Sequence, residues 1–237
     1  MIDKIMFGES IKDYKIISKL GQGSFGSVYK VMNIKDKKYY ALKQIILDEA
    51  KKEEKEQLMK EAHILSKINS EHVVKYFNSF FEGNSFNIIM EFCEGLDLRK
   101  FLNGHKKLNK PLDKAIIYKF ILELCLGIKE IHKNNLIHRD LKPQNIFLDK
   151  NNRLKIGDFG ISTILKSTRY ASSRVGTYNY MAPEIIKGQK YNNKVDIWAL
   201  GCIIYELCTY ALILLQFYNY VIKFSMKLMI IFLITKK

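Results

Sequence analysis

The feature that most constrains this chain is the polar run HRDLKPQN at residues 138–145, with Asp158-Phe-Gly following thirteen residues after Asn145. Magnesium prefers hard oxygen ligands and takes few of them from the protein, which leaves positions for water and phosphate. Asn145 and Asp158 supply such a pair. Asp140 can accept a hydroxyl proton, and Lys142 can neutralise charge on a transferred phosphoryl group. A base, a cation and a metal site in this order predict phosphoryl transfer.

A glycine cluster with the pattern GxGxxG begins at Gly21 and ends at Gly26. In dinucleotide-binding folds the third glycine of this pattern opens a helix. Here it opens the strand-like run Val28-Tyr-Lys-Val31, so we expect the glycines at the tip of a hairpin. Glycine lets backbone N–H groups approach phosphate without obstruction by a side chain. The glycines alone leave open a plain hairpin turn without a ligand.

Lys43 lies inside an apolar strand-like segment, where a buried ammonium group is costly unless it is paired. Glu61 lies between Leu58 and Leu65 on the apolar face of a predicted helix, so its carboxylate needs a cation. We expect the two to pair when helix and strand pack together, with Lys43 holding phosphate oxygens. The alternative is a lysine that extends to solvent and a surface glutamate.

The chain changes character near residues 94–96. Before this boundary one helix is predicted at residues 49–68, and strands are predicted at 14–20, 27–34, 39–47, 73–81 and 86–92. After it, a long apolar-periodic helix is predicted at 115–132. The pattern predicts an α+β protein with a β-rich lobe followed by a helical lobe.

The composition is basic, with 39 Lys and Arg against 24 Asp and Glu, a formal net charge of +15. The lysines are spread along the chain, and no helix-turn-helix, zinc-finger or RNP signature accompanies them, so we expect a general attraction to acidic partners and no nucleic-acid function. The N-terminus has no apolar core for a signal peptide. The spacing of the four cysteines suits neither a disulfide framework nor a zinc site, which predicts an intracellular protein.

Taken together, these motifs resemble those of eukaryotic protein kinases from about Tyr14 to Leu207, and Lys142 after His-Arg-Asp-Leu is typical of Ser/Thr kinases. Finer segments are similar to those of the NIMA-related (never-in-mitosis) kinases: GSFGSVYK at 23–30, ALKQI at 41–45, IMEFCEG at 89–95, PQNIFL at 143–148, KIGDFGI at 155–161, MAPE at 181–184 and VDIWALGC at 195–202. The resemblance implies transfer of the γ-phosphoryl group of ATP to Ser/Thr hydroxyls of protein substrates, with ATP and Mg²⁺ in the cleft of a two-lobed fold. It implies an N-lobe at 14–94 and a C-lobe at 95–207.

The resemblance also implies roles for individual residues. Adenine is expected between Val28 and Ala41 on one side and Phe147 on the other, with Met90 as gatekeeper. The backbone of Glu91 and Cys93 is expected to bond the adenine edge. The implied ATP-binding set is Leu20, Gly21, Gln22, Gly23, Ser24, Phe25, Gly26, Ser27, Val28, Ala41, Lys43, Met90, Glu91, Cys93 and Phe147. The implied catalytic residues are Asp140, Lys142, Lys43 and Glu61, and the implied metal ligands are Asn145 and Asp158.

Regulation is implied by Arg139, which stands beside Asp140, because an arginine at this place suits a phosphorylated activation segment. The resemblance favours Ser173 as the phosphorylation site and assigns Thr177 to ordering of the substrate loop. Asp196 is expected to brace the catalytic loop from the start of its helix.

Three departures from the family pattern stand out. The substrate loop reads Gly176-Thr-Tyr-Asn-Tyr180 and lacks a proline, and the segment at 94–98 reads EGLDL where EGGDL is usual. After Leu207 the resemblance ends, so we expect the C-lobe to be incomplete. Glu184 would then be a buried carboxylate without its usual arginine. This leaves a second hypothesis, a catalytically impaired or inactive kinase-fold binding module.

The tail at residues 208–237 is mostly apolar. A membrane span needs about 20 consecutive apolar residues, and Gln216, Asn219, Lys223 and Lys227 interrupt the run. We therefore expect a partly buried helix or a non-native terminus rather than a membrane span. We expect a cytoplasmic protein with protein substrates as partners, and the resemblance is compatible with cytoskeletal, centrosomal or ciliary association. The sequence predicts no particular oligomeric state.

Overall fold

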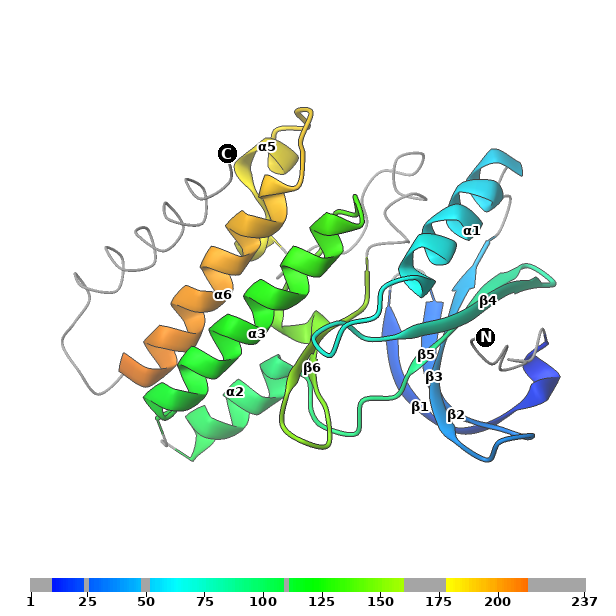
Figure 1. Cartoon of the computed structure of the whole chain (residues 1–237), viewed down its shortest axis with the longest axis horizontal. Coiled ribbons are helices and arrows are strands. Elements are labelled where there is room, and N and C mark those ends of the chain that lie inside the picture. The colour runs from blue at the N-terminus through cyan, green and yellow to red at the C-terminus, as the bar shows by residue number, and fades with distance from the viewer. Residues whose placement is uncertain (1–9, 24–25, 48–51, 109–110, 160–177, 213–237) are drawn as a thin grey trace. The chain divides into compact units, whose positions relative to one another are not determined.

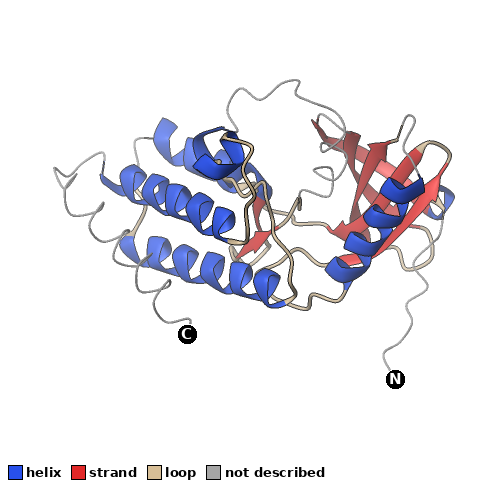
Figure 2. Ribbon diagram, turned by 90° about the horizontal axis from the view of Figure 1, so that it is seen from above, coloured by secondary structure: helices blue, strands red, loops and turns tan. Residues whose placement is uncertain are grey.

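The computed structural model describes residues 10–23, 26–47, 52–108, 111–159 and 178–212. They fall into two compact units. The first, here called the sheet unit, extends to Ser70 and resumes at Val74–Cys93. The second, called the helical unit, contains Glu71–Val73, Glu94–Phe159 and the described residues from 178 onward. Figure 2 shows all the strands of one unit gathered into a sheet and most of the helices in the other.

The sheet unit contains one antiparallel sheet in the order β1-β2-β3-β5-β4 (Figure 1). A short 3-10 helix, Ile11–Asp13, precedes it. The strands are β1 (Tyr14–Gly23), β2 (Gly26–Asn33), β3 (Tyr39–Ile46), β4 (Tyr76–Glu82) and β5 (Ser85–Glu91). All five predicted strands are present. β4 begins three residues later than expected, because Val73 instead forms an isolated parallel bridge with Ile156 of the helical unit's small hairpin.

Helix α1 (Lys52–Ser66) packs against β4. Its buried residues are Leu58, Ala62 and Leu65, the apolar face that the sequence predicts. Strand β5 lies between β3 and β4, and its residues from Ser85 to Met90 are all buried. A central strand buried on both faces needs a nearly continuous apolar run. Its two buried polar residues, Ser85 and Asn87, hydrogen-bond to each other.

The helical unit is built around two long helices that lie side by side, α3 (Lys114–Lys133) and α6 (Lys194–Leu212). The remaining elements are α2 (Leu98–Lys107), a 3-10 turn at Pro143–Asn145, β6 (Ile146–Leu148), β7 (Leu154–Ile156), a 3-10 turn at Tyr178–Tyr180 and α5 (Pro183–Ile186). Asp113 caps α3 by accepting a hydrogen bond from the amide of Ala115 at 2.7 Å. Helix α6 buries Ile197, Leu200, Ile204 and Leu207, which recur at helical spacing.

Two residues of α3 fix the β6–β7 hairpin against the helix. A Cβ atom at Gly127 would lie 2.7 Å from the His72 carbonyl oxygen and 2.9 Å from Cδ1 of Ile156, so only glycine allows this close approach. Four residues earlier, the buried Glu123 carboxylate accepts a hydrogen bond from the Leu154 amide at 2.9 Å. The hairpin that follows the catalytic run is therefore anchored by both packing and a hydrogen bond.

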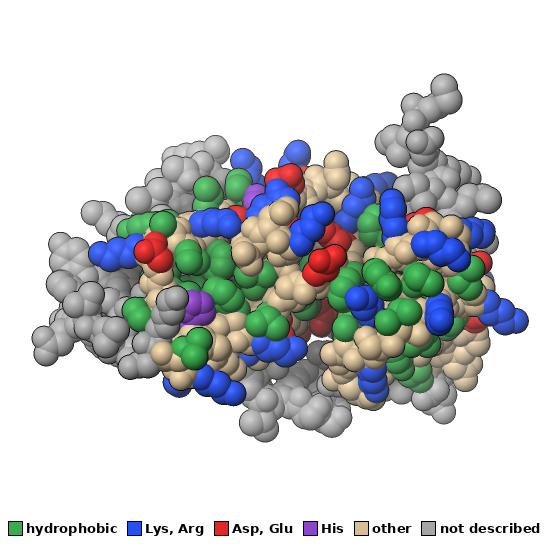
Figure 3. Space-filling view, turned by 90° about the horizontal axis from the view of Figure 1, so that it is seen from below, with side chains coloured by type: hydrophobic (Ala, Val, Ile, Leu, Met, Phe, Trp, Pro, Cys, Tyr) green, Lys and Arg blue, Asp and Glu red, His purple; other side chains and the backbone are tan. Residues whose placement is uncertain are grey.

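The environment of Glu184 differs from our expectation. Its side chain is partly exposed rather than buried, because α5 is a short surface helix with no buried residue. Several large apolar side chains of the helical unit also reach the surface, where Figure 3 shows hydrophobic groups among charged ones. They include Tyr118, Leu122 and Leu126 on α3 and Trp198 and Tyr205 on α6. Within the described ranges, no helix combines the length and apolar character that crossing a membrane requires.

Candidate active site

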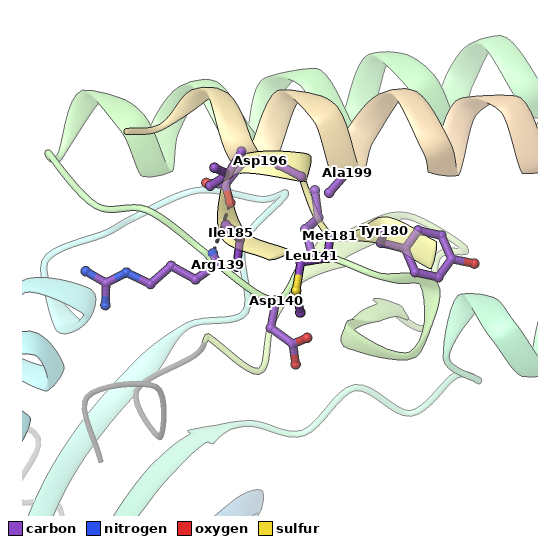
Figure 4. Close-up of a pocket in the computed structure, with 10 residues that line it drawn as sticks. Arg139, Asp140, Leu141, Tyr180, Met181, Ile185, Asp196 and Ala199 are labelled. Carbon is purple, nitrogen blue, oxygen red and sulfur yellow. Dashed lines mark hydrogen bonds between the residues drawn. The ribbon is translucent and has the colours of Figure 1, made fainter. Parts of the chain in front are cut away.

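The loop that carries residues 138–145 is held by Asp196, in the first turn of α6. Its carboxylate accepts hydrogen bonds from the backbone amide of His138 at 2.8 Å, the backbone amide of Arg139 at 3.0 Å and Nε2 of His132 at 2.9 Å. Figure 4 shows the bond to Arg139. Asp196 is 1% exposed, and burying a carboxylate is favourable only when its lone pairs are satisfied in this way. The sequence-based expectation that Asp196 braces this loop agrees with these contacts.

Two physical consequences follow from this arrangement. Burial alone would raise the pKa of Asp196, but the hydrogen bond from His132, the nearby His138 and the two backbone amides outweigh it and lower the pKa. Arg139 has φ 68°, a left-handed conformation that is uncommon for a residue with a side chain. The turn aims two successive N–H groups at one carboxylate, in the manner of an anion-binding nest.

His138 connects the catalytic run to the Asp158-Phe-Gly segment. The imidazole is fully buried, and its Nε2 donates to the Gly157 carbonyl oxygen at 2.9 Å while its Nδ1 accepts from the Asp140 amide at 3.3 Å. Both ring nitrogens of His138 are therefore engaged by backbone groups. The ring also stacks near Phe159, with centroids 4.9 Å apart. His138 therefore fixes the backbone on either side of the site.

Asp140 lies at the centre of a small polar group. Its Oδ2 atom accepts hydrogen bonds from Nζ of Lys142 at 2.8 Å and from Nδ2 of Asn145 at 3.2 Å. The same Asn145 nitrogen donates to the Asp140 backbone carbonyl at 2.7 Å. The carboxylate is about a quarter exposed, so it is open to an approaching group. The structure thus brings together Asp140, Lys142 and Asn145, three residues that the sequence motif identifies as candidates.

The side-chain oxygen atoms of Asn145 and Asp158 are of the type that binds a magnesium ion. The Gly157 amide donates to the Asn145 backbone carbonyl at 2.9 Å, which ties the two segments together one residue before Asp158. Since the Asn145 side-chain nitrogen is engaged by Asp140, its amide oxygen is the atom that remains to face a cation. A carboxylate and an amide oxygen are hard ligands of the type that Mg²⁺ prefers. Asp158 has φ 52°, a second left-handed position within this site.

In the sheet unit the glycine cluster forms a hairpin, as predicted. Gly21 pairs with Val28, and Gly23 pairs with Gly26, which begins β2. A Cβ atom at Gly26 would lie 1.8 Å from the Gln44 carbonyl oxygen, so no other residue fits there without a backbone shift. Leu20 and Gln22 lie on β1 and Ser27 lies on β2. Ser24 and Phe25, also assigned to ATP binding, lie outside the described residues.

Strand register places four further candidates on one face of the sheet. Val28 is paired with Lys43, and Ala41 is paired with Met90. Side chains two residues apart on a strand point to the same face, and so do directly paired residues. Val28, Ala41, Lys43 and Met90 therefore share a face. Ala41 and Met90 are buried, whereas Lys43 is half-buried.

The remaining candidates are distributed over both units. Glu61 is half-buried on α1, and its pairing with Lys43 stays a prediction. Glu91 ends β5, and Cys93 follows it, half-buried. Phe147 lies in the helical unit, at the centre of β6. Ser173 and Thr177, assigned to regulation, lie outside the described residues.

One site residue escaped the sequence analysis. His132 lies in the last turn of α3, and its ring nitrogen bonds the same Asp196 oxygen that the His138 amide contacts. In the sequence, His132 gives little indication of this role, because a histidine near a helix C-terminus is ordinarily explained by its favourable interaction with the helix dipole. Its partner lies 64 residues away in the sequence.

A protein kinase domain matches residues 14–236. The chain belongs to the protein kinase family. The β-rich N-terminal sheet and the helical unit are accordingly the two lobes of an α+β kinase fold, and the match runs past Leu207, where our motif comparison ended.

The kinase domain is similar to NIMA-related kinases. It is 39% identical over 200 residues to the serine/threonine-protein kinase Nek1 of Mus musculus, and this matched region makes up 84% of this chain and 16% of Nek1. It is 41% identical over 198 residues to Nek5 of Homo sapiens, covering 83% and 28%. It is 38% identical over 201 residues to the probable serine/threonine-protein kinase nek2 of Dictyostelium discoideum, covering 83% and 48%. The chain thus spans less than half the length of each of these relatives.

Proposed function

We propose that this chain is an ATP-dependent protein kinase that phosphorylates serine and threonine hydroxyls. The observation that carries the proposal is the group formed by Asp140, Lys142 and Asn145 on a loop that Asp196 braces. A base, with a cation and an amide each within hydrogen-bonding distance of it, supplies side chains that phosphoryl transfer needs. The family membership and the similar serine/threonine kinases support the same activity.

The proposed reaction begins at Asp140. Both side-chain hydrogen bonds described above fall on its Oδ2 atom, so an acceptor hydroxyl would approach Oδ1. The hydroxyl gives its proton to Asp140 while its oxygen forms a bond to the γ-phosphorus of ATP. The bond from that phosphorus to the bridging oxygen breaks, and ADP leaves. Lys142, at 2.8 Å from the carboxylate, stabilises the negative charge on the transferred group.

Nucleotide binding is proposed for the shared face of Val28, Ala41, Lys43 and Met90 and for the glycine hairpin. Apolar Val28, Ala41 and Met90 suit a purine, and Phe147 of β6 is proposed as a further adenine contact. Lys43 supplies the cation for phosphate oxygens, and Glu61 is proposed to orient it. Asn145 and Asp158 are proposed to hold Mg²⁺, which when bound offsets the charge of the phosphates.

Regulation by phosphorylation at Ser173 forms part of the proposal. A phosphate there would add negative charge and strong acceptors, and Arg139 would pair with it. Thr177 is proposed to order the substrate loop. The Ser173→Ala variant should then lose the activation that autophosphorylation gives. Equal activity of the variant and the wild-type chain after preincubation with ATP would place the regulatory site elsewhere. Cytoplasmic location and protein substrates are proposed from the family.

The test is incubation of the full chain with ATP, Mg²⁺ and a general protein acceptor, followed by mass spectrometry of the product. Phosphoserine or phosphothreonine is expected, and the Asp140→Asn variant serves as the matched control. Predominant phosphotyrosine would refute the proposed specificity. Acceptor phosphorylation no greater than that of Asp140→Asn would favour the inactive binding module instead.

A further inference from the structure

The first turn of α2 contains a cation that the helix itself does not favour. Asp97 caps α2 by accepting a hydrogen bond from the Lys100 amide at 2.8 Å, which places Arg99 among the first residues of the helix. The N-terminal end of a helix carries partial positive charge, so an arginine there is electrostatically unfavourable. The residues of α2 that face the core are Leu98 and Leu102. Interactions outside the helix must therefore account for the position of Arg99.

Arg99 is held by residues from two other elements of the helical unit. Its guanidinium forms a two-pronged ion pair with Glu206 of α6, in which Nη1 contacts Oε1 and Nη2 lies 3.0 Å from Oε2. Nη2 also donates to the hydroxyl of Tyr180, and that hydroxyl donates to Oε2 of Glu206 at 2.6 Å. Side-chain exposures of 23% for Arg99 and 17% for Glu206 place the pair where solvent screens it only in part.

Tyr180 is the member of this triad that belongs to the segment bordering Asp140. Burial, and then the hydrogen bond to Glu206, raise the pKa of Tyr180, so its hydroxyl stays protonated and continues to donate. Its neighbours Met181 and Ala182 line a pocket together with Asp140 and Leu141. Figure 4 shows the Tyr180 ring directed away from Asp140, while Met181 lies beside it. The side chain of Tyr180 thus anchors the segment, and the following residues form the wall.

We propose that Arg99 is a positioning residue for the protein substrate, which acts with Glu206 through Tyr180 to fix the wall at residues 180–182 beside Asp140. The inference rests on the proposed kinase function, because that wall serves the acceptor protein. A misplacement of about 1 Å in a reacting group can lower rates a hundredfold, so a fixed wall matters for transfer to the acceptor. ATP binding does not depend on it, since the nucleotide candidates described above are other residues.

The test compares three single variants in the full chain. Arg99→Met removes the guanidinium and keeps an unbranched apolar side chain, and Tyr180→Phe removes only the hydroxyl. Lys100→Met is the matched control, because Lys100 is the exposed neighbour on the same helix and pairs with Asp97. For each we would measure kcat/KM for a serine-containing peptide acceptor, KM for ATP and the melting temperature.

Loss of a charge-assisted hydrogen bond predicts a fall of about tenfold in kcat/KM for the acceptor in Arg99→Met and in Tyr180→Phe. KM for ATP is expected to remain within about twofold of the wild-type value. Arg99→Lys should recover only part of the loss, because an ammonium group cannot reproduce the two-pronged contact. In a double variant that combines Arg99→Met and Tyr180→Phe, kcat/KM for the acceptor should be no lower than in the poorer single variant, because both substitutions act through one triad.

Acceptor kinetics of Arg99→Met and Tyr180→Phe equal to those of Lys100→Met would overturn the inference while leaving the kinase function intact. Equal rises in KM for ATP and for the acceptor would also overturn it, because they would indicate a general structural effect. If Arg99→Met fails to fold, Tyr180→Phe alone decides, since its ring packing is unchanged. An inactive wild-type chain would instead contradict the proposed function itself.

Discussion

In the sheet unit, Lys43 is placed by pairing with Val28 on the neighbouring strand, whereas in the helical unit the backbone around Asp140 is placed by Asp196, which follows His138 by 58 residues. The first arrangement depends on strand register, which follows from the alternation of apolar residues along short segments. The second depends on one buried carboxylate that satisfies several donors at once.

The difference implies different sensitivities to substitution. A sheet whose register is set by many apolar residues tolerates changes on its exposed face. A loop that depends on a single buried acceptor loses several hydrogen bonds when that acceptor is removed.

The largest effect is expected on catalysis, and it separates the roles of the two units. Asp140→Asn should lower kcat by about 10²–10⁴-fold, the contribution typical of a general base, with little change in KM for ATP. Lys43→Met should lower kcat and also raise KM for ATP, because Lys43 is assigned to the phosphates. Steady-state kinetics at varied ATP concentration would measure both. An Asp140→Asn variant impaired mainly in ATP binding would break the division between the units.

Removing the buried acceptor should have the largest effect on stability. Asp196→Ala leaves the amides of His138 and Arg139 and the ring of His132 without their acceptor, which should cost about 3–5 kcal/mol in unfolding free energy. The matched control is Asp113→Ala, which removes a capping carboxylate from α3 and should cost about 1 kcal/mol. Denaturant titration gives both values, and similar losses in the two variants would contradict the account.

Acid should weaken the helical unit through the same carboxylate. The pKa of Asp196 is lower in the folded state than in the unfolded state. The carboxylate therefore contributes fully to stability at a pH above the unfolded-state pKa, and this contribution is lost as the pH falls through the folded-state pKa. The denaturation midpoint should therefore fall as the pH is lowered below about 4. The Asp196→Asn variant should show a shallower fall. An identical pH profile in variant and wild type would assign acid sensitivity to other groups.

The smallest effect is expected at a single half-buried side chain of β2, Lys30. Lys30 lies 4.2 Å from the centre of the Tyr39 ring and 4.5 Å from that of Phe92. Lys30→Met removes this cation–π contact and should cost about 0.5–1 kcal/mol. Lys15→Met, on the exposed part of β1, should change the stability by less than about 0.5 kcal/mol. A loss in Lys30→Met as large as that in Asp196→Ala would show that the sheet is equally fragile.

Much of the fold follows from local patterns in the sequence. The five strands, the buried face of α1 and the buried residues of α6 are all explained by apolar periodicity. Helix α2 was not predicted, because it is polar and contains Gly104 in its interior, which disfavours a helix by about 1 kcal/mol. The β6–β7 hairpin was missed as well, since its strands have only three residues each.

The site was predictable to the extent that its residues lie within one motif. Asp140, Lys142 and Asn145 are within hydrogen-bonding distance because the chain carries them through one tight loop. His132 and Arg99 were not predictable, because their partners lie on α6, far along the chain. Their roles depend on tertiary packing, for which apolar periodicity gives no signal.

The central claim is that one buried carboxylate, that of Asp196, holds the loop at residues 138–145, whereas strand register places the residues proposed to bind the nucleotide. Amide hydrogen exchange tests this claim most directly. In the wild-type chain the amides of His138 and Arg139 should be protected to the same degree as amides within α6. In Asp196→Asn both should exchange much faster, while the amides of Leu42 and Lys43 in β3 keep their protection. Unchanged protection at His138 and Arg139, or an equal loss in β3, would contradict the account.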